Sequence, residues 1–161
     1  MLGMTIWLTL LIPICLFLIL KHRHVIASFD MEKASERTEP YIYTTLCFGA
    51  WTYALYSIMQ APSYLWLTTA GATIALLGVM LINRRWKISA HLTAMGGLTG
   101  GMCSMCLYYH TWMLWPVIIV LLVSLLLMYA RLYLDAHTPT QVVAGYGLGL
   151  VLTSIPYLIY A

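Results

Sequence analysis

The chain has 161 residues, of which 62% are hydrophobic and 8% are charged, and its formal net charge is +3. A water-soluble domain carries about 25% charged residues, so this composition excludes a soluble globular protein. It predicts an integral membrane protein, and the length is that of one domain covering residues 1–161.

Six apolar stretches are long enough to cross a bilayer as helices. The hydrocarbon core needs about 20 apolar residues per helix, and backbone groups in lipid must be hydrogen-bonded within the segment. The first stretch lacks the basic start and the cleavage site of a secretory signal, so we expect it to remain as a span. We therefore predict an all-α, polytopic membrane protein with six transmembrane helices in one bundle. The spans cover residues 1–20, 41–61, 63–82, 91–109, 111–130 and 141–160.

The charged residues gather in three of the connections between these spans. All Lys, Arg, Asp and Glu lie in residues 21–40, 83–90 and 131–140, which follow the first, third and fifth spans. Because the chain changes sides at each crossing, these connections share one face of the membrane. The positive-inside rule explains such a face as the cytoplasmic one. A polar site assembled from three loops explains it equally well, and the two explanations are compatible.

The first charged connection predicts a short helix that begins at Asp30 and ends at Pro40. On it Lys33 and Arg37 are four residues apart and face the same way. Their mutual repulsion would be relieved by an anion between them. The alternative is an amphipathic helix that lies on lipid headgroups.

The second charged connection predicts a helix N-terminus beside a histidine. Ser89 suits the N-cap of the fourth span, which places His91 in its first turn, and Lys87 adds a mobile positive charge. Glycines on the fourth and sixth spans have the spacing that lets two helices approach closely. We expect these two spans to pack together and to bring His91 near His137. The glycines are Gly96, Gly97, Gly100, Gly101, Gly145 and Gly149.

The third charged connection, in the segment ARLYLDAHTPTQ, predicts a second such N-terminus. Thr138 and Gln141 fit a capping box with Pro139 at the first helical position. His137 then precedes free N–H groups that attract anions, and Arg131 offers a planar fork suited to phosphate. The alternative is that Arg131 and His137 are interfacial anchors facing headgroups.

Together the three connections suit phosphoryl transfer. One histidine can attack phosphorus and another can protonate the departing oxygen, while the cations neutralise the phosphoryl oxygens. A zinc site needs three or four converging ligands. His91, His137 and Asp135 could supply some of them, but the surrounding cations argue against zinc. We expect no metal, no cofactor and no nucleic acid partner.

Four cysteines lie inside the apolar stretches, at Cys15, Cys47, Cys103 and Cys106. The Cys103-x-x-Cys106 pair has neither a second pair nor a suitably spaced histidine pair beside it. We therefore expect buried thiols that pack as small apolar groups.

At these residues the sequence resembles the type-2 phosphatidic acid phosphatases, also called lipid phosphate phosphatases. The family pattern has three motifs, K-x6-R-P, P-S-G-H and S-R-x5-H-x3-D. KASERTEP, from Lys33 to Pro40, looks like a rearranged first motif, and ISAH, ending at His91, is similar to the second. ARLYLDAHTPTQ is similar to the third, with Arg131 and His137 at the family spacing.

The resemblance implies a phosphohistidine mechanism with a membrane lipid as substrate. His137 would be the nucleophile and His91 the general acid. The phosphate would be bound by Lys33, Arg37, Lys87, Ser89, Arg131 and backbone N–H groups near Ala90.

The chain departs from the family pattern at the residue that orients the nucleophile. Gln141 stands where the family has an aspartate, and a glutamine can accept the N–H of His137 but cannot stabilise a cationic imidazole as a carboxylate does. The activity could be lower, Asp135 or Glu39 could substitute, or the site could be inactive. Further departures are Ala130 for serine, Ile88 for proline and Ala90 for glycine.

We therefore predict a lipid phosphatase of the bacterial inner membrane that acts on a lipid phosphate or pyrophosphate at the bilayer surface. The side of the site stays open, because bacterial members commonly work at the periplasmic face and the charge rule indicates the cytoplasm. The alternatives are a non-catalytic lipid-phosphate-binding protein and a structural subunit. Small-residue helix faces would also allow an oligomer.

Overall fold

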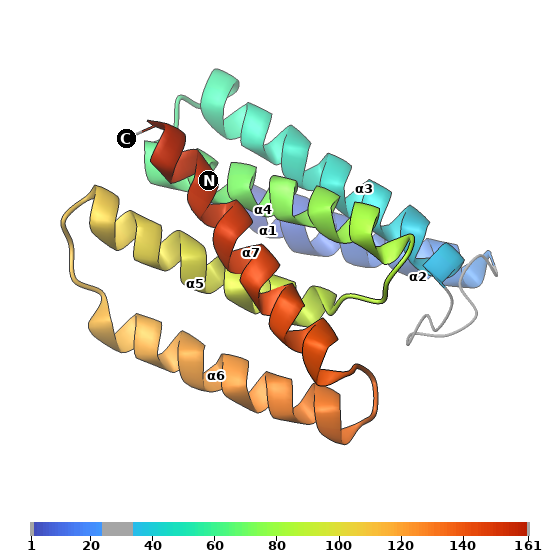
Figure 1. Cartoon of the computed structure of the whole chain (residues 1–161). Coiled ribbons are helices and arrows are strands. Elements are labelled where there is room, and N and C mark those ends of the chain that lie inside the picture. The colour runs from blue at the N-terminus through green and yellow to red at the C-terminus, as the bar shows by residue number, and fades with distance from the viewer. Residues whose placement is uncertain (1, 24–33, 161) are drawn as a thin grey trace.

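The computed structural model describes residues 2–23 and 34–160, and within these ranges all regular secondary structure is helical. This confirms the predicted all-α class for the described part of the chain. The elements in Figure 1 are α1 (Leu2–Ile6), η1 (Trp7–Leu11), α2 (Ile12–His22), α3 (Ala34–Tyr53), η2 (Ala54–Ile58), α4 (Ser63–Asn83), α5 (Ala90–Tyr108), α6 (Leu114–Tyr133) and α7 (Pro139–Tyr160), where η marks a π-helical segment.

Four helical segments are long and apolar enough to span a membrane: Gly3–His22, Ser63–Asn83, Leu114–Tyr133 and Pro139–Tyr160. They are compatible with a membrane protein. The other two predicted spans correspond to α3 with η2 and to α5. α3 begins at Ala34 and includes the charged segment SERTEP, and α5 carries four glycines and several hydroxyl side chains, which lower the hydropathy of both.

The predicted helix end at Pro40 is wrong, because α3 begins at Ala34 and continues through this proline. Pro40 lies in the second turn, where its missing N–H deprives only the carbonyl of Glu36 of a partner. The Thr44 hydroxyl donates to the Pro40 carbonyl at 2.8 Å. The predicted cap Asp30 and the predicted site residue Lys33 lie outside the described residues.

The two ends of α6 also differ from the prediction. α5 ends in a Schellman turn, in which His110 has a φ of 52° and Thr111 N–H donates to the Cys106 carbonyl at 3.0 Å. The turn delays the start of α6 to Leu114. At its other end α6 runs three residues beyond Ala130, so Arg131 lies in its last turn, where a cation is favourable.

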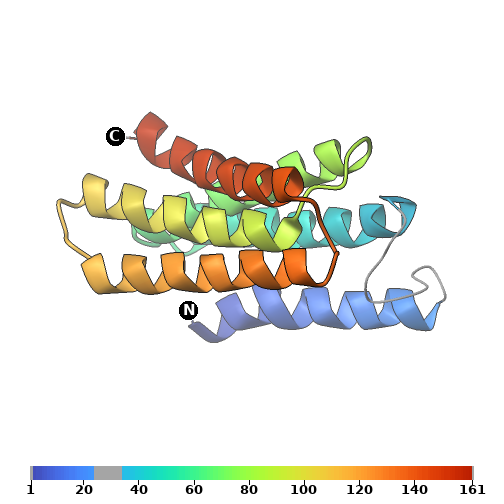
Figure 2. The same ribbon diagram turned by 60° about the horizontal axis from the view of Figure 1, so that its bottom comes forward.

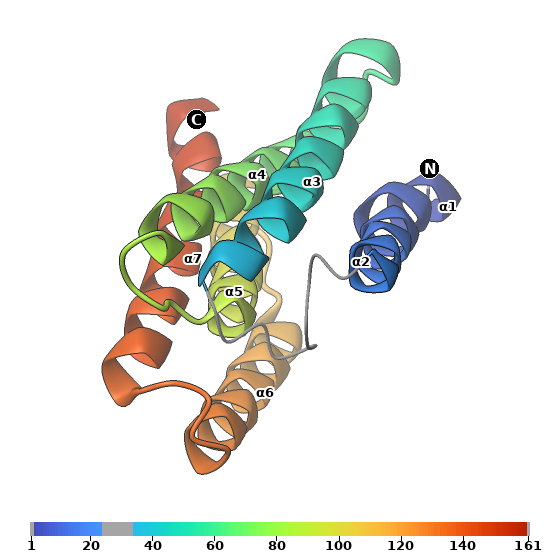
Figure 3. The same ribbon diagram turned by 90° about the vertical axis from the view of Figure 1, so that its right-hand side faces the viewer.

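The helices form a bundle in which the most extensive contact is between α5 and α7. Figure 2 shows the helices running roughly parallel or antiparallel, and Figure 3 shows α6 and the N-terminal rod of α1, η1 and α2 at the edges. α5 and α7 contact each other along most of their length, and α4 joins α7 to α3. α6 packs mainly against α5, and its one buried residue is Ser124. The edge helices therefore expose broad apolar faces.

Glycines bring the backbones of α5 and α7 into contact, as predicted. A Cβ added to Gly149 would overlap the Thr93 carbonyl and would lie 2.7 Å from the Gly97 nitrogen. A Cβ on Gly145 would lie 2.7 Å from the Ser89 carbonyl oxygen. These small-residue faces are therefore buried inside the chain, where they set the spacing of the two helix N-termini.

The charged residues and a cluster of aromatic rings lie at opposite ends of the bundle. The end of α2, the start of α3, the α4–α5 connection and the α6–α7 connection share one end (Figure 1). At the other end Tyr and Trp rings pack edge to face, including Tyr108 with Tyr157 at 6.1 Å and Trp66 with Tyr160 at 5.0 Å. Such aromatic clusters are typical of a membrane interface.

The prediction of buried cysteines is wrong. All four thiols are free, Cys15 and Cys103 are exposed, and Cys47 and Cys106 are partly exposed. The lipid-facing side of a transmembrane helix is as apolar as its inward side, so an apolar neighbourhood in the sequence does not distinguish burial in protein from contact with lipid.

Gly149→Ala tests the close packing of α5 and α7. We expect it to lower the free energy of unfolding by about 1–3 kcal/mol, because the new methyl group meets backbone atoms that cannot move aside. Gly147→Ala is the matched control, since a Cβ there has no atom within 4 Å. We expect this control to be neutral or more stable, by about 0.5–1 kcal/mol. Thermal unfolding in detergent measures both, and equal melting temperatures would contradict the packing.

Candidate functional site

The predicted capping box starts α7. The Thr138 hydroxyl accepts from Gln141 N–H at 3.4 Å, and Gln141 Oε1 accepts from Thr138 N–H at 3.2 Å. This reciprocal pair satisfies two N–H groups that a helix start leaves unpaired. The helix begins at Pro139, as predicted, and the side chain of Gln141 is directed back toward the connection.

The same amide oxygen fixes the tautomer of His137. Nδ1 of His137 lies 3.1 Å from Gln141 Oε1. Thr138 N–H also donates to this atom, which identifies it as the amide oxygen and not the nitrogen. Because an amide oxygen can only accept, Nδ1 must carry a proton and donate it. Nε2 then keeps its lone pair. The arrangement leaves Nε2 of His137 able to act as a nucleophile or as a base.

A second turn motif positions the loop between α6 and α7. Asp135 has a φ of 48°, its N–H donates to Leu132 at 3.1 Å, and Ala136 N–H donates to the Arg131 carbonyl at 3.2 Å. These bonds form a Schellman motif with aspartate at the left-handed position that glycine usually takes. The motif reverses the chain within five residues, so Arg131 and His137 come from opposite arms of one tight turn.

His137 lies at an open pocket of about 520 Å³ at the charged end of the bundle. Pockets of this size hold small ligands. Its lining combines the α6–α7 loop with the α4–α5 connection, and consists of Lys87, Leu132, Asp135, Ala136, His137, Thr138, Pro139 and Gln141.

Three cations surround His137 and affect its protonation. Burial lowers the pKa of His137, the hydrogen bond to Gln141 raises it, and the charges of Arg131, Lys87 and Arg37 lower it further. The net shift is downward from the ordinary value of about 6.5. The stabilisation that goes with the neutral imidazole is therefore complete above that pH and is lost as the pH falls through the lowered pKa. At neutral pH His137 is uncharged.

The start of α5 lies beside this cluster. Ser89 is the N-cap, as predicted, and its hydroxyl accepts from Leu92 N–H at 3.5 Å. Ser89 is 0% exposed and its N–H donates to the Gln141 carbonyl at 3.4 Å, so it joins the two helix starts and does not face the open pocket. His91, in the first turn, is exposed and interacts electrostatically with Arg131.

Arg37 reaches the cluster from α3 through a contact that the sequence did not reveal. It is 5% exposed, and its Nη1 donates to Oδ1 of Asn83 at 3.3 Å, where Asn83 is 3% exposed. Asn83 is the last residue of α4. The feature of the sequence that could have identified Asn83 is a polar amide at the end of an apolar span, next to two arginines. The amide accepts from the guanidinium without adding a negative charge.

Arg131 also carries a buried donor, since its Nε makes no hydrogen bond within the described part of the chain. A buried unsatisfied N–H is costly, and an oxyanion is a natural acceptor for it.

Arg131, Lys87 and Arg37 therefore interact electrostatically with His137, Arg131 also interacts with His91, and Gln141 bonds to His137. Ser89 is buried beside Gln141, and Ala90 lies in the first turn of α5. Among the described residues, no group of three His, Cys, Asp or Glu side chains is arranged to hold a metal ion. The assembled chemistry suits an anion: fixed cations, two helix N-termini and one neutral imidazole. The chain matches no protein-family model, no curated protein and no solved structure.

Asn83→Asp tests whether the positive charge of Arg37 contributes to an anion site. The new carboxylate would form a charge-assisted bond with the guanidinium, so we expect the melting temperature to be kept or raised. The carboxylate would also repel an anion, and we expect the affinity for inorganic phosphate to fall about tenfold, equivalent to about 1.4 kcal/mol. Calorimetric titration and thermal unfolding measure the two effects. Unchanged phosphate affinity would show that Arg37 does not contribute to an anion site.

Proposed function

We propose that the protein is an integral membrane lipid phosphatase, similar in mechanism to the type-2 phosphatidic acid phosphatases. It would hydrolyse a phosphate or pyrophosphate monoester of a lipid at the charged end of the bundle. The observation that carries the proposal is the hydrogen bond from His137 Nδ1 to Gln141, which leaves a neutral Nε2 near Arg37, Lys87 and Arg131.

In the proposed first step, Nε2 of His137 attacks the terminal phosphorus, and the bond from phosphorus to the leaving oxygen breaks. His91 donates a proton to that oxygen. A lipid alcohol leaves from a monophosphate, and a lipid phosphate leaves from a pyrophosphate. Water then attacks the phosphohistidine, His91 accepts its proton, and inorganic phosphate departs. Arg37, Lys87 and Arg131 would neutralise the oxygens of the phosphoryl group throughout.

We further propose that α3 with η2 and α5 also cross the bilayer, which gives six spans in a bacterial inner membrane. The reversal of chain direction at each connection supports this, since the three charged connections then meet one interface. The polar starts of α3 and α5 would lie in the headgroup region, next to the phosphate of a lipid held within the bilayer.

A second candidate is a protein that binds lipid phosphates without turnover. The specific observation in its favour is that the partner of His137 is a neutral amide. An amide holds the imidazole in place, but it does not stabilise the positive charge that the ring gains when it bonds to phosphorus.

His137→Ala tests the phosphatase in purified protein supplied with a panel of lipid phosphates and pyrophosphates. We expect the parent to release inorganic phosphate and the variant to lose essentially all of this activity, because no other imidazole occupies the position of the nucleophile. His22→Ala, which removes an exposed histidine at the end of α2, is the control and should leave the rate unchanged. Equal rates for the parent and His137→Ala would reject the mechanism.

Gln141→Glu separates the two candidates. Glutamate has the length of glutamine and is favoured in a capping box, so we expect the cap to be kept. Its carboxylate would raise the pKa of His137 and stabilise the charged ring, and we expect phosphate release to rise by about tenfold or more. NMR titration of the imidazole and turnover assays measure the two effects. A raised pKa without turnover in either protein would favour the binding protein.

A further inference from the structure

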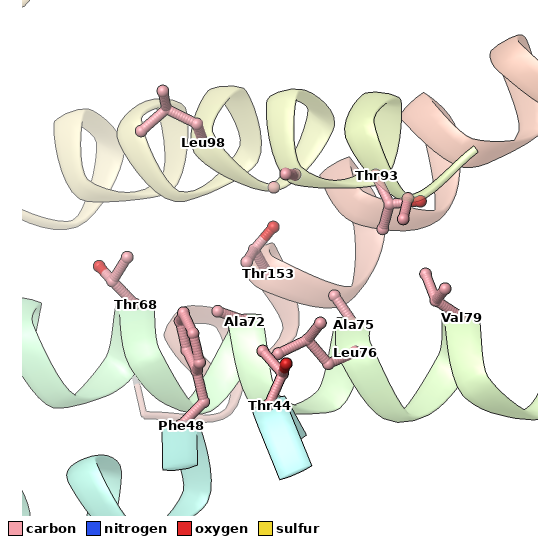
Figure 4. A pocket seen from close by; sticks show the side chains of 13 residues that line it. Thr44, Phe48, Thr68, Ala72, Ala75, Leu76, Val79, Thr93, Leu98 and Thr153 are labelled. Carbon is pink, nitrogen blue, oxygen red and sulfur yellow. The ribbon is translucent and has the colours of Figure 1, made fainter. Parts of the chain in front are cut away.

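A second cavity, of about 360 Å³, lies within the bundle between α3, α4, α5 and α7. Figure 4 shows it as the space between α4 and α5, with Thr153 of α7 directed into it from behind. The residues that line it are small or apolar: Thr44, Phe48, Thr68, Ala72, Ala75, Leu76, Val79, Ala90, Thr93, Ala94, Gly97, Leu98 and Thr153.

The threonine hydroxyls that line this cavity form hydrogen bonds within the protein. Thr44 donates to the Pro40 carbonyl at 2.8 Å, Thr68 to Tyr64 at 2.6 Å and Thr93 to Ser89 at 3.0 Å. Thr153 donates to the carbonyl one turn before it, that of Gly149. Thr68 also shares a hydrogen bond with the Tyr157 hydroxyl at 2.8 Å, so all four hydroxyls have partners within the protein. Apolar cavities exclude water and accept apolar ligands.

Arg37, Lys87 and Arg131 are called the cation cluster below. On three helices the cavity lies one or two turns further into the bundle than the residues at or beside this cluster. Thr44 is two turns further along α3 than Arg37, Val79 is one turn before Asn83 on α4, and Thr93 is one turn after Ser89 on α5. Residues at these spacings share a helix face. The same inward faces therefore carry phosphate-binding chemistry at the membrane surface and an apolar cavity beneath it.

The depth of the cavity matches one leaflet of a bilayer. Its lining runs from Ala90 to Leu98 on α5 and from Thr68 to Val79 on α4, which is eight and eleven residue rises, or about 12 and 17 Å at 1.5 Å per residue. Half of the hydrocarbon core is about 15 Å. A chain that hangs from a phosphate held at the cluster would reach the end of the cavity without leaving its own leaflet.

We infer that this cavity holds one hydrocarbon chain of the lipid whose phosphate binds at the cluster, an inference that rests on the proposed function. Ala72, Ala75 and Gly97 keep the cavity open, and a larger side chain at Ala72 or Ala94 would fill it. Both positions are partly or fully exposed, so a larger side chain there can be accommodated without breaking the core.

The test uses the full chain in nanodiscs with a phosphatidic acid that carries a photoactivatable diazirine midway along one acyl chain. Mass spectrometry locates the labelled residues. We expect labelling at cavity residues such as Phe48, Leu76 and Leu98. Phosphatidylcholine with the same diazirine chain is the control, because it has no phosphate monoester. We expect it to label the cavity less than phosphatidic acid does.

Ala72→Phe and Ala94→Phe are expected to reduce cavity labelling about tenfold, the discrimination that a filled apolar pocket commonly gives. Ala50→Phe is the matched control, because Ala50 is exposed on α3 and does not line the cavity. Its labelling should equal that of the parent. Each variant is also assayed for phosphate release from the same lipid and from phenyl phosphate, which has no such chain.

Cavity labelling that the two filling variants abolish supports the inference when the parent releases no phosphate, or when the same variants also slow its phosphate release from the diazirine lipid. Labelling without phosphate release would reject the phosphatase and keep the chain site. Labelling spread over the exposed face of α6, or cavity labelling that persists in Ala72→Phe and Ala94→Phe, would overturn the inference. Phosphate release from the diazirine lipid that both filling variants leave unchanged would also overturn it.

Discussion

The contact between the backbones of α5 and α7 is the constraint on which the rest of the structure depends. Gly145 and Gly149 let α7 approach α5 until backbone atoms of the two helices meet at these positions. This spacing brings two helix N-termini to one place, and each has a histidine beside it. Ser89 joins the two starts through its bond to the Gln141 carbonyl. Larger residues along this contact would move α7 away from α5 and would separate the residues of the candidate site.

Two neutral amides lie among the positive charges of the candidate site. Arg37 donates to the amide of Asn83, and His137 donates to the amide of Gln141. A carboxylate in place of either amide would bind its partner more strongly but would add a negative charge beside the cations. The two amides hold their partners without adding such a charge. This benefits the proposed anion site, because a nearby negative charge would repel a phosphate.

Much of the site could be predicted because its signals are local. The capping box at Thr138, the N-cap at Ser89 and the glycine spacing depend on neighbours within one or two helix turns, where hydrogen-bond geometry is fixed by sequence distance. The helix through Pro40, the exposed cysteines and the Arg37–Asn83 bond depend on what packs nearby in space. Asn83 and Arg37 are 46 residues apart, so no local pattern joins them. Lys33 lies outside the described residues, and its role stays a prediction.

The edge position of α6 has a consequence for the site. Arg131 is carried by a helix with a single buried residue, Ser124, and with few contacts to α7. The packing of α6 within the chain is therefore mainly its contact with α5. In a bilayer, as proposed above, the surrounding acyl chains would press on the outer face of α6 and would help to keep the Arg131 guanidinium near the two imidazoles. In that setting the lipid would be a structural component of the site.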